Sequence, residues 1–160
     1  MTRAQKLHLD KFLPYRLSVL SNTVSGAIAA AYFMNFGLSI PEWRVMAVLA
    51  ANPGLSAAEV TARTAMDKVA VSRAVATLLA AGRLRRTTVP ADRRRTHLQL
   101  SSAGTRVYAQ VVPMALEYER SLLTPLSKRD RETLDRLLRI LLGRAVEMGP
   151  AHTGQRTGSD

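Results

Sequence analysis

Residues 56–104 constrain the fold of this 160-residue chain most, because they combine two capped helices with two short strand-like runs. Ser56 and Glu59 have the spacing of a capping box, which predicts a helix that starts at Ser56. The helical pattern breaks near residues 65–66, and Asp67 can cap a second helix that Gly82 ends. This order of elements indicates a helix-turn-helix.

The second helix has two faces of different character. Val71, Val75, Leu78 and Leu79 recur at helical spacing, so we expect them to be buried. The opposite face then offers side chains that can donate to base edges or phosphates. These are Lys68, Ser72, Arg73 and Thr77. For this helix alone, an ordinary solvated face explains the pattern equally well.

A basic hairpin is expected after the second helix. Residues 84–89 and 96–100 are β-compatible runs, and residues 90–95 separate them as a loop. The loop carries Arg93, Arg94 and Arg95, which repel one another unless they meet anions. An arginine in a narrow minor groove gains from the negative potential there, and Asp92 is expected to orient Arg94. We therefore interpret residues 56–104 as a DNA-binding winged helix-turn-helix.

Several motifs in the chain resemble the MarR family of transcriptional regulators. The wing motif is Pro90-x-Asp92-Arg93-Arg94 followed by Leu98-x-Leu100-Ser101-x-x-Gly104. Upstream matches are Leu38-Ser39-x-x-Glu42-Trp43-Arg44-Val45 and Val71-Ser72-Arg73-x-Val75-x-x-Leu78. The resemblance extends to about Met148. It implies a mostly α-helical fold with a β-hairpin wing, in which helices from both termini form a dimer.

The remaining segments are predicted to be helical. One long helix is expected over residues 7–36, and a capping box at Ser39 opens the next helix. Ser101 and Ser127 cap the last two helices, and Pro113 is expected to kink the first of these. The last helix carries a broad apolar stripe: Leu134, Leu137, Leu138, Leu141, Leu142, Ala145 and Met148. Since no other segment remains to cover this stripe, a second subunit should bury it.

These patterns divide the chain into four expected parts. Residues 1–36 form an N-terminal dimerisation helix, and residues 37–104 form the DNA-binding lobe. Residues 105–148 form the C-terminal dimerisation helices, and residues 149–160 form a disordered tail.

A ligand site is expected from Arg16 and from the family resemblance. By helical angle, Arg16 lies within an apolar stripe between Leu13 and Leu20, where an unpaired guanidinium is costly. A carboxylate of the terminal helices is the favoured partner, and a ligand carboxylate is the alternative. The resemblance implies a small aromatic carboxylate or phenol between the dimer helices and the DNA-binding lobe. Candidate contacts are Arg16, Asn22, Trp43 and Arg44, although Trp43 also fits ordinary packing.

The likeness of residues 9–22 to members associated with aromatic-compound catabolism points to a hydroxybenzoate-like effector.

Composition narrows the function classes. The net charge of +11 favours a polyanionic partner, and the chain contains no cysteine, which excludes thiol-based sensing. No signal peptide and no run of transmembrane length are expected, so a cytoplasmic protein is predicted. The three histidines lie on separate segments without metal-ligand spacing, and catalytic motifs are missing. An enzyme, a metal site and a cofactor are therefore not expected.

The leading hypothesis is a homodimeric, sequence-specific regulator, a repressor that a small aromatic acid releases from a pseudo-palindromic operator. One alternative is an architectural DNA-binding protein that tolerates any sequence, for which the positive charge would suffice. Another is a winged-helix module that binds an acidic protein and no duplex.

Overall fold

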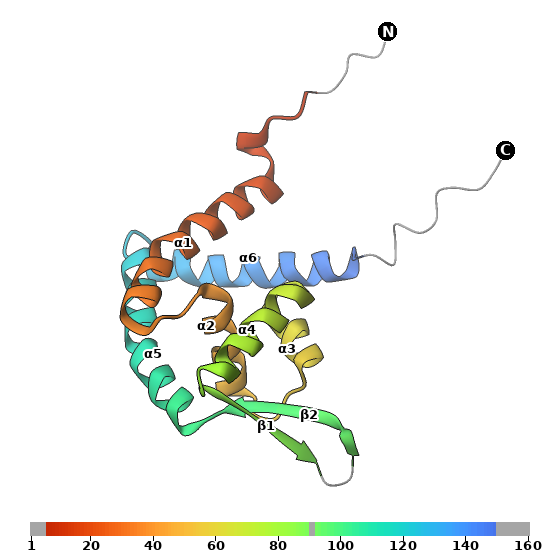
Figure 1. The fold of residues 1–160 in the computed structure, drawn as a ribbon. Helices are drawn as coiled ribbons and strands as arrows, with labels where there is room; N and C mark the ends of the chain where they lie inside the picture. Colours follow the sequence, from red (N-terminus) through yellow and green to blue (C-terminus); the bar gives the residue numbers. More distant parts are fainter. Residues whose placement is uncertain (1–5, 90–91, 150–160) are drawn as a thin grey trace, which may run out of the picture. The chain divides into compact units, whose positions relative to one another are not determined.

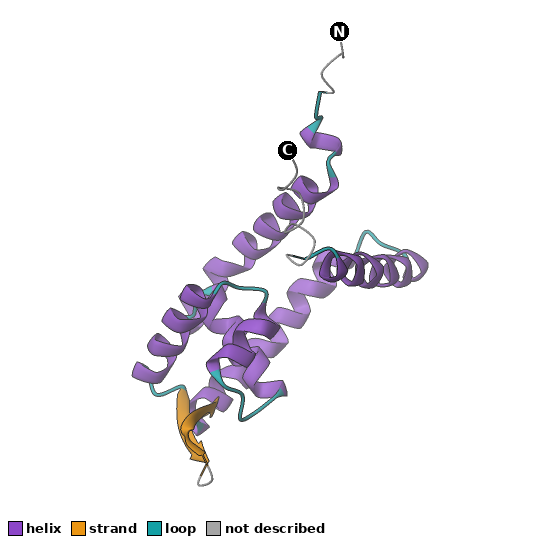
Figure 2. Cartoon of the chain, turned by 90° about the vertical axis from the view of Figure 1, so that its right-hand side faces the viewer, coloured by secondary structure: helices purple, strands orange, loops and turns teal. Residues whose placement is uncertain are grey.

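The computed structural model describes residues 6–89 and 92–149, with only the backbone of residues 88, 89 and 92–95. Within these ranges it contains six α-helices and one antiparallel hairpin (Figures 1 and 2). The elements are η1 (Leu9–Lys11), α1 (Leu13–Phe36), α2 (Ile40–Ala51), α3 (Ala57–Thr64), α4 (Lys68–Ala80), β1 (Leu84–Val89), β2 (Asp92–Leu100), α5 (Ser102–Leu123) and α6 (Lys128–Glu147). The predicted mostly α-helical fold with a winged helix-turn-helix lobe is confirmed. The tail predicted over residues 149–160 lies outside the described residues, except for Gly149.

The first helix begins at Leu13, not at residue 7 as expected. Residues Leu9–Lys11 form the short 3-10 helix η1, and Phe12 has an extended backbone before α1. Pro14 explains this boundary, because proline fits the first turn of a helix but breaks the hydrogen-bond ladder deeper inside one. Near the other end of the chain, α5 continues as one helix through Pro113.

The expectation that no run reaches transmembrane length is wrong for α1. Its 24 residues are long and apolar enough to cross a membrane by length and composition. Small polar residues such as Ser18, Ser21 and Ser25 interrupt the apolar pattern, but alanines and large apolar residues outweigh them. A helix that is buried between protein subunits has the same composition, so this property alone does not make α1 a membrane span.

The chain divides into two compact units, Met1–Leu116 and Glu117–Asp160. The core of the first unit is built from α2, α3, α4 and α5, with Ile28 and Tyr32 added from α1 and Leu84 and Leu98 added from the hairpin. Its most buried side chains are Leu38, Val45, Met46, Leu49, Val60, Val71, Leu78 and Val111. This core fixes the exposed side of α4, because one face of α4 is committed to it.

Helix α6 belongs to the second unit and starts where the sequence predicts. The Asp130 amide donates to the Ser127 hydroxyl oxygen at 3.2 Å, which is an N-terminal cap. None of the residues of α6 is buried in the single chain. The predicted apolar stripe is therefore present and uncovered, as the exposure of Leu134, Leu137, Leu138, Leu141 and Leu142 demonstrates.

Candidate nucleic-acid interface

Two side-chain caps define the helix-turn-helix. The Ser56 amide donates to a Glu59 carboxylate oxygen at 2.8 Å, and the Glu59 amide donates to the Ser56 hydroxyl at 3.3 Å. Ala65 ends α3 in the left-handed conformation, with φ of 51°. The Asp67 carboxylate then accepts from the Ala70 amide at 2.8 Å and starts α4. The predicted turn between α3 and α4 is confirmed.

The capping box also determines the acidity of Glu59. The backbone amide of Ser56 is the main cause that lowers the pKa of Glu59, and the Ser56 hydroxyl lowers it further. Arg63 and His97 contribute smaller favourable charge interactions. Glu59 therefore remains ionised when α3 is formed, which suits its position at a helix N-terminus.

Helix α4 divides into a buried and an exposed side, as predicted, except that Leu79 is only half-buried. Val71, Ala74, Val75 and Leu78 are buried against the lobe core. The four predicted DNA contacts, Lys68, Ser72, Arg73 and Thr77, are all exposed. The Thr77 hydroxyl donates to the Arg73 carbonyl at 3.1 Å, so its proton is already used within the helix. Its oxygen remains able to accept a hydrogen bond.

A hollow lies beside the first turn of α4. It is lined by Ala57, Ala58 and Thr61 from α3 and by Lys68, Val71 and Ser72 from α4. Because the two alanines are small, α3 leaves Lys68 and Ser72 open to a bulky polyanion.

The wing is an antiparallel ladder in which Leu84 pairs with Leu100 and Arg86 pairs with Leu98. A bulge separates Thr88 from Val89. The pairing of Val89 with Asp92 extends β2, so the arginines at 93–95 lie in the strand and not in a loop, which corrects the prediction. The side chains of Asp92, Arg93, Arg94 and Arg95 lie outside the described part, and their predicted roles stay predictions.

Hydrogen bonds tie the base of the wing to the turn between α2 and α3. The Leu98 amide donates to the Leu55 carbonyl at 2.8 Å, and the Gly54 amide donates to the Leu98 carbonyl at 2.9 Å. The His97 ring nitrogen Nδ1 also forms a hydrogen bond with the Gly54 carbonyl oxygen. The sequence assigned His97 no role, and the structure gives it this anchoring contact.

Two further exposed arginines were not among the predicted contacts. Arg85 and Arg86 lie next to each other on β1, and both are exposed. Arg86 lines a second hollow, between α4 and the wing, with Ala57, Val75, Thr96 and Leu98. The sequence did contain a signal for their exposure. Side chains alternate between the two faces of a strand, and both faces of a two-stranded sheet can reach solvent. Arg86 therefore enlarges the positive surface beside α4.

The role of Arg83 was also missed, and Gly104 was noted only as part of the wing motif. The Arg83 guanidinium donates to the Phe36 carbonyl at 2.6 Å, so it contacts the end of α1. A Cβ atom at Gly104 would lie only 2.0 Å from the Arg83 carbonyl oxygen. The glycine in the Ser101-x-x-Gly104 motif is therefore required by a close backbone approach.

The four candidate effector contacts lie on two helices. Arg16 and Asn22 are exposed on α1, and none of the described side chains of the single chain forms an ion pair with Arg16. Trp43 and Arg44 are half-buried on α2. The Trp43 ring stacks on Tyr108 and lies tilted against Tyr32, with centroid separations of 5.5 Å in both pairs. Trp43 thus has a packing role, and the effector roles of all four residues stay predictions.

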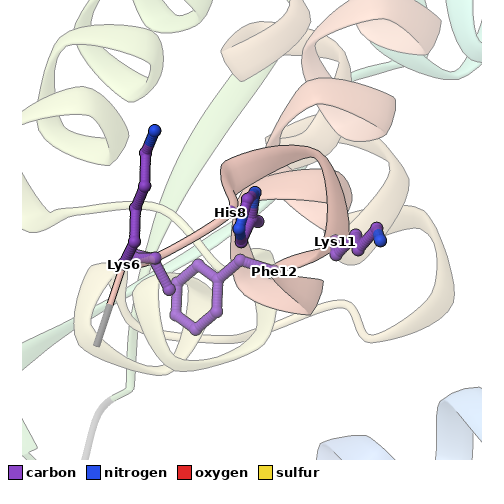
Figure 3. Close-up of a pocket in the computed structure, with 5 residues that line it drawn as sticks. Lys6, His8, Lys11 and Phe12 are labelled. Carbon is purple, nitrogen blue, oxygen red and sulfur yellow. The ribbon is translucent and has the colours of Figure 1, made fainter. Parts of the chain in front are cut away.

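A separate hollow lies at the N-terminal segment (Figure 3). It is lined by Lys6, Leu7, His8, Lys11 and Phe12, all of which are exposed. Because one short segment forms it, this hollow does not join any of the predicted effector contacts. Among residues 6–89 and 92–149, no group of three or more His, Asp or Glu side chains could hold a metal ion.

Residues 36–95 match the model of a protein family described as the MarR family. The transcriptional regulator HosA of Escherichia coli O111:H- is 26% identical to this chain over 105 residues. That alignment covers 66% of this chain and 78% of HosA.

Solved structures share the fold. A MarR/EmrR family transcriptional regulator from Acinetobacter sp. ADP1 matches with a TM-score of 0.83 and 25% identity, over 88% of this chain and 99% of that protein. BpsR of Bordetella bronchiseptica matches with a TM-score of 0.66 and 23% identity, over 79% of this chain and 98% of BpsR. At that identity, the match with BpsR concerns the fold alone.

Proposed function

Because this chain belongs to the MarR family of transcriptional regulators, we propose that it is a homodimeric repressor that binds a pseudo-palindromic operator. The observation that carries the proposal is the exposed side of α4. Lys68 and Arg73 are free to contact DNA there, and Arg85 and Arg86 of the wing are exposed nearby in sequence. Family and relatives are regulators and not enzymes.

Each α4 helix enters a major groove in this proposal, and the two half-sites lie about one helical turn apart. Lys68, Ser72, Arg73 and Thr77 contact bases and phosphates, and Arg94 enters the flanking minor groove while Arg93 and Arg95 contact phosphates. Asp92 orients Arg94. The net charge of +11 supports a strong electrostatic contribution, which makes affinity fall as salt rises.

The dimer forms through α1, α5 and α6. The uncovered stripe of α6 supports this assignment, and so do the exposed apolar residues Leu13, Leu17 and Leu20 of α1. Soluble monomers rarely expose apolar surface of this extent. A soluble DNA-binding protein of this kind would be cytoplasmic.

The effector is a small aromatic acid of the hydroxybenzoate class, bound by Arg16, Asn22, Trp43 and Arg44. The structure of BpsR was solved to explain how 6-hydroxynicotinic acid regulates its DNA binding, and that ligand is an aromatic hydroxy acid. Arg16 is exposed on α1, so its guanidinium is accessible to a ligand carboxylate. To release DNA, the ligand must bind one dimer conformation better than the other.

Fluorescence anisotropy tests the proposal. The protein is titrated against a duplex from its own promoter region and a shuffled duplex, near physiological salt, with and without hydroxybenzoates or 6-hydroxynicotinic acid. A preference of about a thousandfold or more for the promoter is expected. Loss of that preference with one of these acids would support the effector class.

Two arginine variants sharpen the result. Arg73→Ala should lose about 1–3 kcal/mol at the promoter and relax base preference, because a base contact specifies sequence. Arg93→Ala should weaken all duplexes alike, because a phosphate contact only positions the protein. Uniform weakening by both variants, together with equal binding to both duplexes, would favour the architectural alternative instead.

A further inference from the structure

We propose that Arg83 is a positioning residue that fixes recognition helix α4 relative to α1. In the dimer it would thereby set the spacing between the two α4 helices. This inference rests on the function proposed above, since spacing matters only if both α4 helices contact one DNA molecule. The guanidinium and the backbone of Arg83 provide separate lines of evidence.

The Arg83 guanidinium caps the C-terminus of α1. Its Nη2 donates to the Phe36 carbonyl at 2.6 Å, and its Nη1 lies 3.5 Å from the Gly37 carbonyl oxygen. Gly37 ends α1 in the left-handed conformation, with φ of 57°. The last carbonyls of a helix carry partial negative charge and lack partners within the helix. Arg83 is half-buried, so solvent screens this interaction less than it would screen a surface pair.

The backbone of Arg83 is attached to α4. Gly82 ends that helix with φ of +66°, and the Arg83 amide donates back to the Leu78 carbonyl at 2.8 Å. This is the hydrogen bond of a Schellman motif, which fixes the direction in which the chain leaves the helix. The position of Arg83 therefore follows the position of α4.

The start of α5 holds the same residue from the other side. The Ser101 amide donates to the Arg83 carbonyl at 3.0 Å, and the Ser101 hydroxyl donates to the Gly82 carbonyl at 2.6 Å. Gly104 packs so close that a Cβ atom there would meet the Arg83 carbonyl oxygen. Arg83 thus has little freedom to move without moving the ends of three helices.

The hydrogen bonds of Arg83 separate it from the exposed arginines of the wing. Arg85 and Arg86 are exposed, whereas Arg83 is half-buried and bonded to α1. Its charge contributes to the positive potential of the lobe, but its guanidinium already donates to a backbone carbonyl of the protein. The effect of replacing it should therefore depend on the geometry of the operator more than on the number of phosphates contacted.

The first test compares one half-site with a full operator. The probes are the full duplex that the wild-type protein selects from a random DNA pool, a duplex with one half-site only, and the full duplex with one base pair inserted between half-sites. Arg83→Gln should bind the half-site within about twofold of wild type. It should bind the full duplex at least tenfold more weakly and discriminate less against the inserted base pair.

Two control variants separate geometry from charge and folding. Arg106→Gln removes the same charge from an exposed position on α5 and should retain the preference for the correct spacing. Arg83→Lys keeps the charge and one donor group, so it should recover part of the full-duplex affinity. Equal weakening of half-site and full duplex by Arg83→Gln, or no change at either, would overturn the proposal.

A second test needs no DNA. Because the chain lacks cysteine, Ala30→Cys on α1 and Ala76→Cys on α4 provide two unique spin-label sites, both exposed in the single chain. The doubly labelled protein is diluted into unlabelled protein, so that pulsed electron resonance reports only the distance within one chain. Arg83→Gln should broaden or shift this distance distribution, and Arg83→Lys should do so less.

The two tests distinguish separate failures. If the protein selects no duplex, the proposed function is wrong, and the label distances still decide whether Arg83 positions α4. An unchanged distance distribution in Arg83→Gln would overturn the positioning role, whatever the DNA results. If Arg83→Gln does not fold by circular dichroism, the comparison of Arg83→Lys with wild type takes its place in both tests.

Discussion

Helices α4 and α6 are both amphipathic, but only α4 is covered within its own unit. Four of the 13 residues of α4 are buried, and Leu78 has an exposed fraction of 1%. Helix α6 has 20 residues and none is buried, and Leu142 has an exposed fraction of 68%. The same kind of sequence pattern therefore describes a completed interface in one case and an open one in the other.

The contrast assigns the two helices to different tasks. The buried side of α4 holds it in the lobe, so its exposed side can present a fixed set of polar groups. The apolar stripe of α6 is not buried within its own unit, so we propose that a second copy of the chain covers it. Three changes test this difference, and a fourth tests the capping box of α3, in decreasing order of expected effect.

The largest effect is expected for Leu78→Ala in α4. Removing a fully buried leucine should lower the free energy of unfolding by about 2–5 kcal/mol. Urea denaturation at two protein concentrations checks this, with Leu142→Ala on α6 as the matched control. The loss for Leu78→Ala should be the same at both concentrations, whereas any loss for Leu142→Ala should depend on concentration. Equal, concentration-independent losses at both positions would contradict the contrast.

Leu138→Glu should disrupt the proposed dimer. A charge within the stripe of α6 should remove about 2 kcal/mol or more of association free energy, as at an interface hot spot. Sedimentation equilibrium measures the change. Ile140→Glu introduces the same charge two residues further along, on the other side of the helix. Dissociation by Ile140→Glu and not by Leu138→Glu would mean that a different face of α6 forms the contact.

Gly143→Ala should give a smaller change of opposite sign. A Cβ atom at Gly143 meets nothing within 4 Å in the single chain, and alanine favours the helix interior over glycine by about 1 kcal/mol. We expect the free energy of unfolding, measured by thermal unfolding, to rise by up to about that amount. A loss would indicate that a second subunit approaches the backbone of α6 closely at this position.

The smallest effect concerns acid stability through Glu59. Its pKa is lowered in the folded state by the Ser56 hydrogen bonds. Glu59 therefore adds stability that is present above its ordinary pKa of 4.5 and is lost as pH falls through the folded value. Glu59→Gln should reduce stability at neutral pH and match wild type at low pH. A constant difference at all pH values, measured by urea denaturation, would contradict this reason.

Local signals made much of the fold predictable. Ser39, Ser56, Asp67 and Ser127 each start a helix at the predicted place, because the cap and its partner lie within three residues. The exposed side of α4 was predicted from the helical spacing of its apolar residues. The exposure of the four predicted contacts on α4 could therefore be predicted from the sequence. The loop expected over residues 90–95 was too long, because residues 92–95 belong to β2.

Contacts between distant segments could not be predicted in this way. Arg83 reaches a carbonyl 47 residues away, and His97 reaches one 43 residues away. Arg83 looked like an ordinary residue of the turn before β1, and His97 like an ordinary residue of a strand, because their partners are defined only by tertiary packing. The start of α1 was misplaced for another reason. The apolar period continues before Pro14, but proline fits only the first turn of a helix, so the helix cannot extend far before it.

The uncovered stripe of α6 has a consequence for how a cell would use this protein. If two copies must meet before the terminal helices are covered, the amount of protein per cell sets the fraction that can occupy paired half-sites. Occupancy would then rise more steeply than in proportion to the number of copies. Gene dosage would become a control on transcription in its own right, independent of any small molecule.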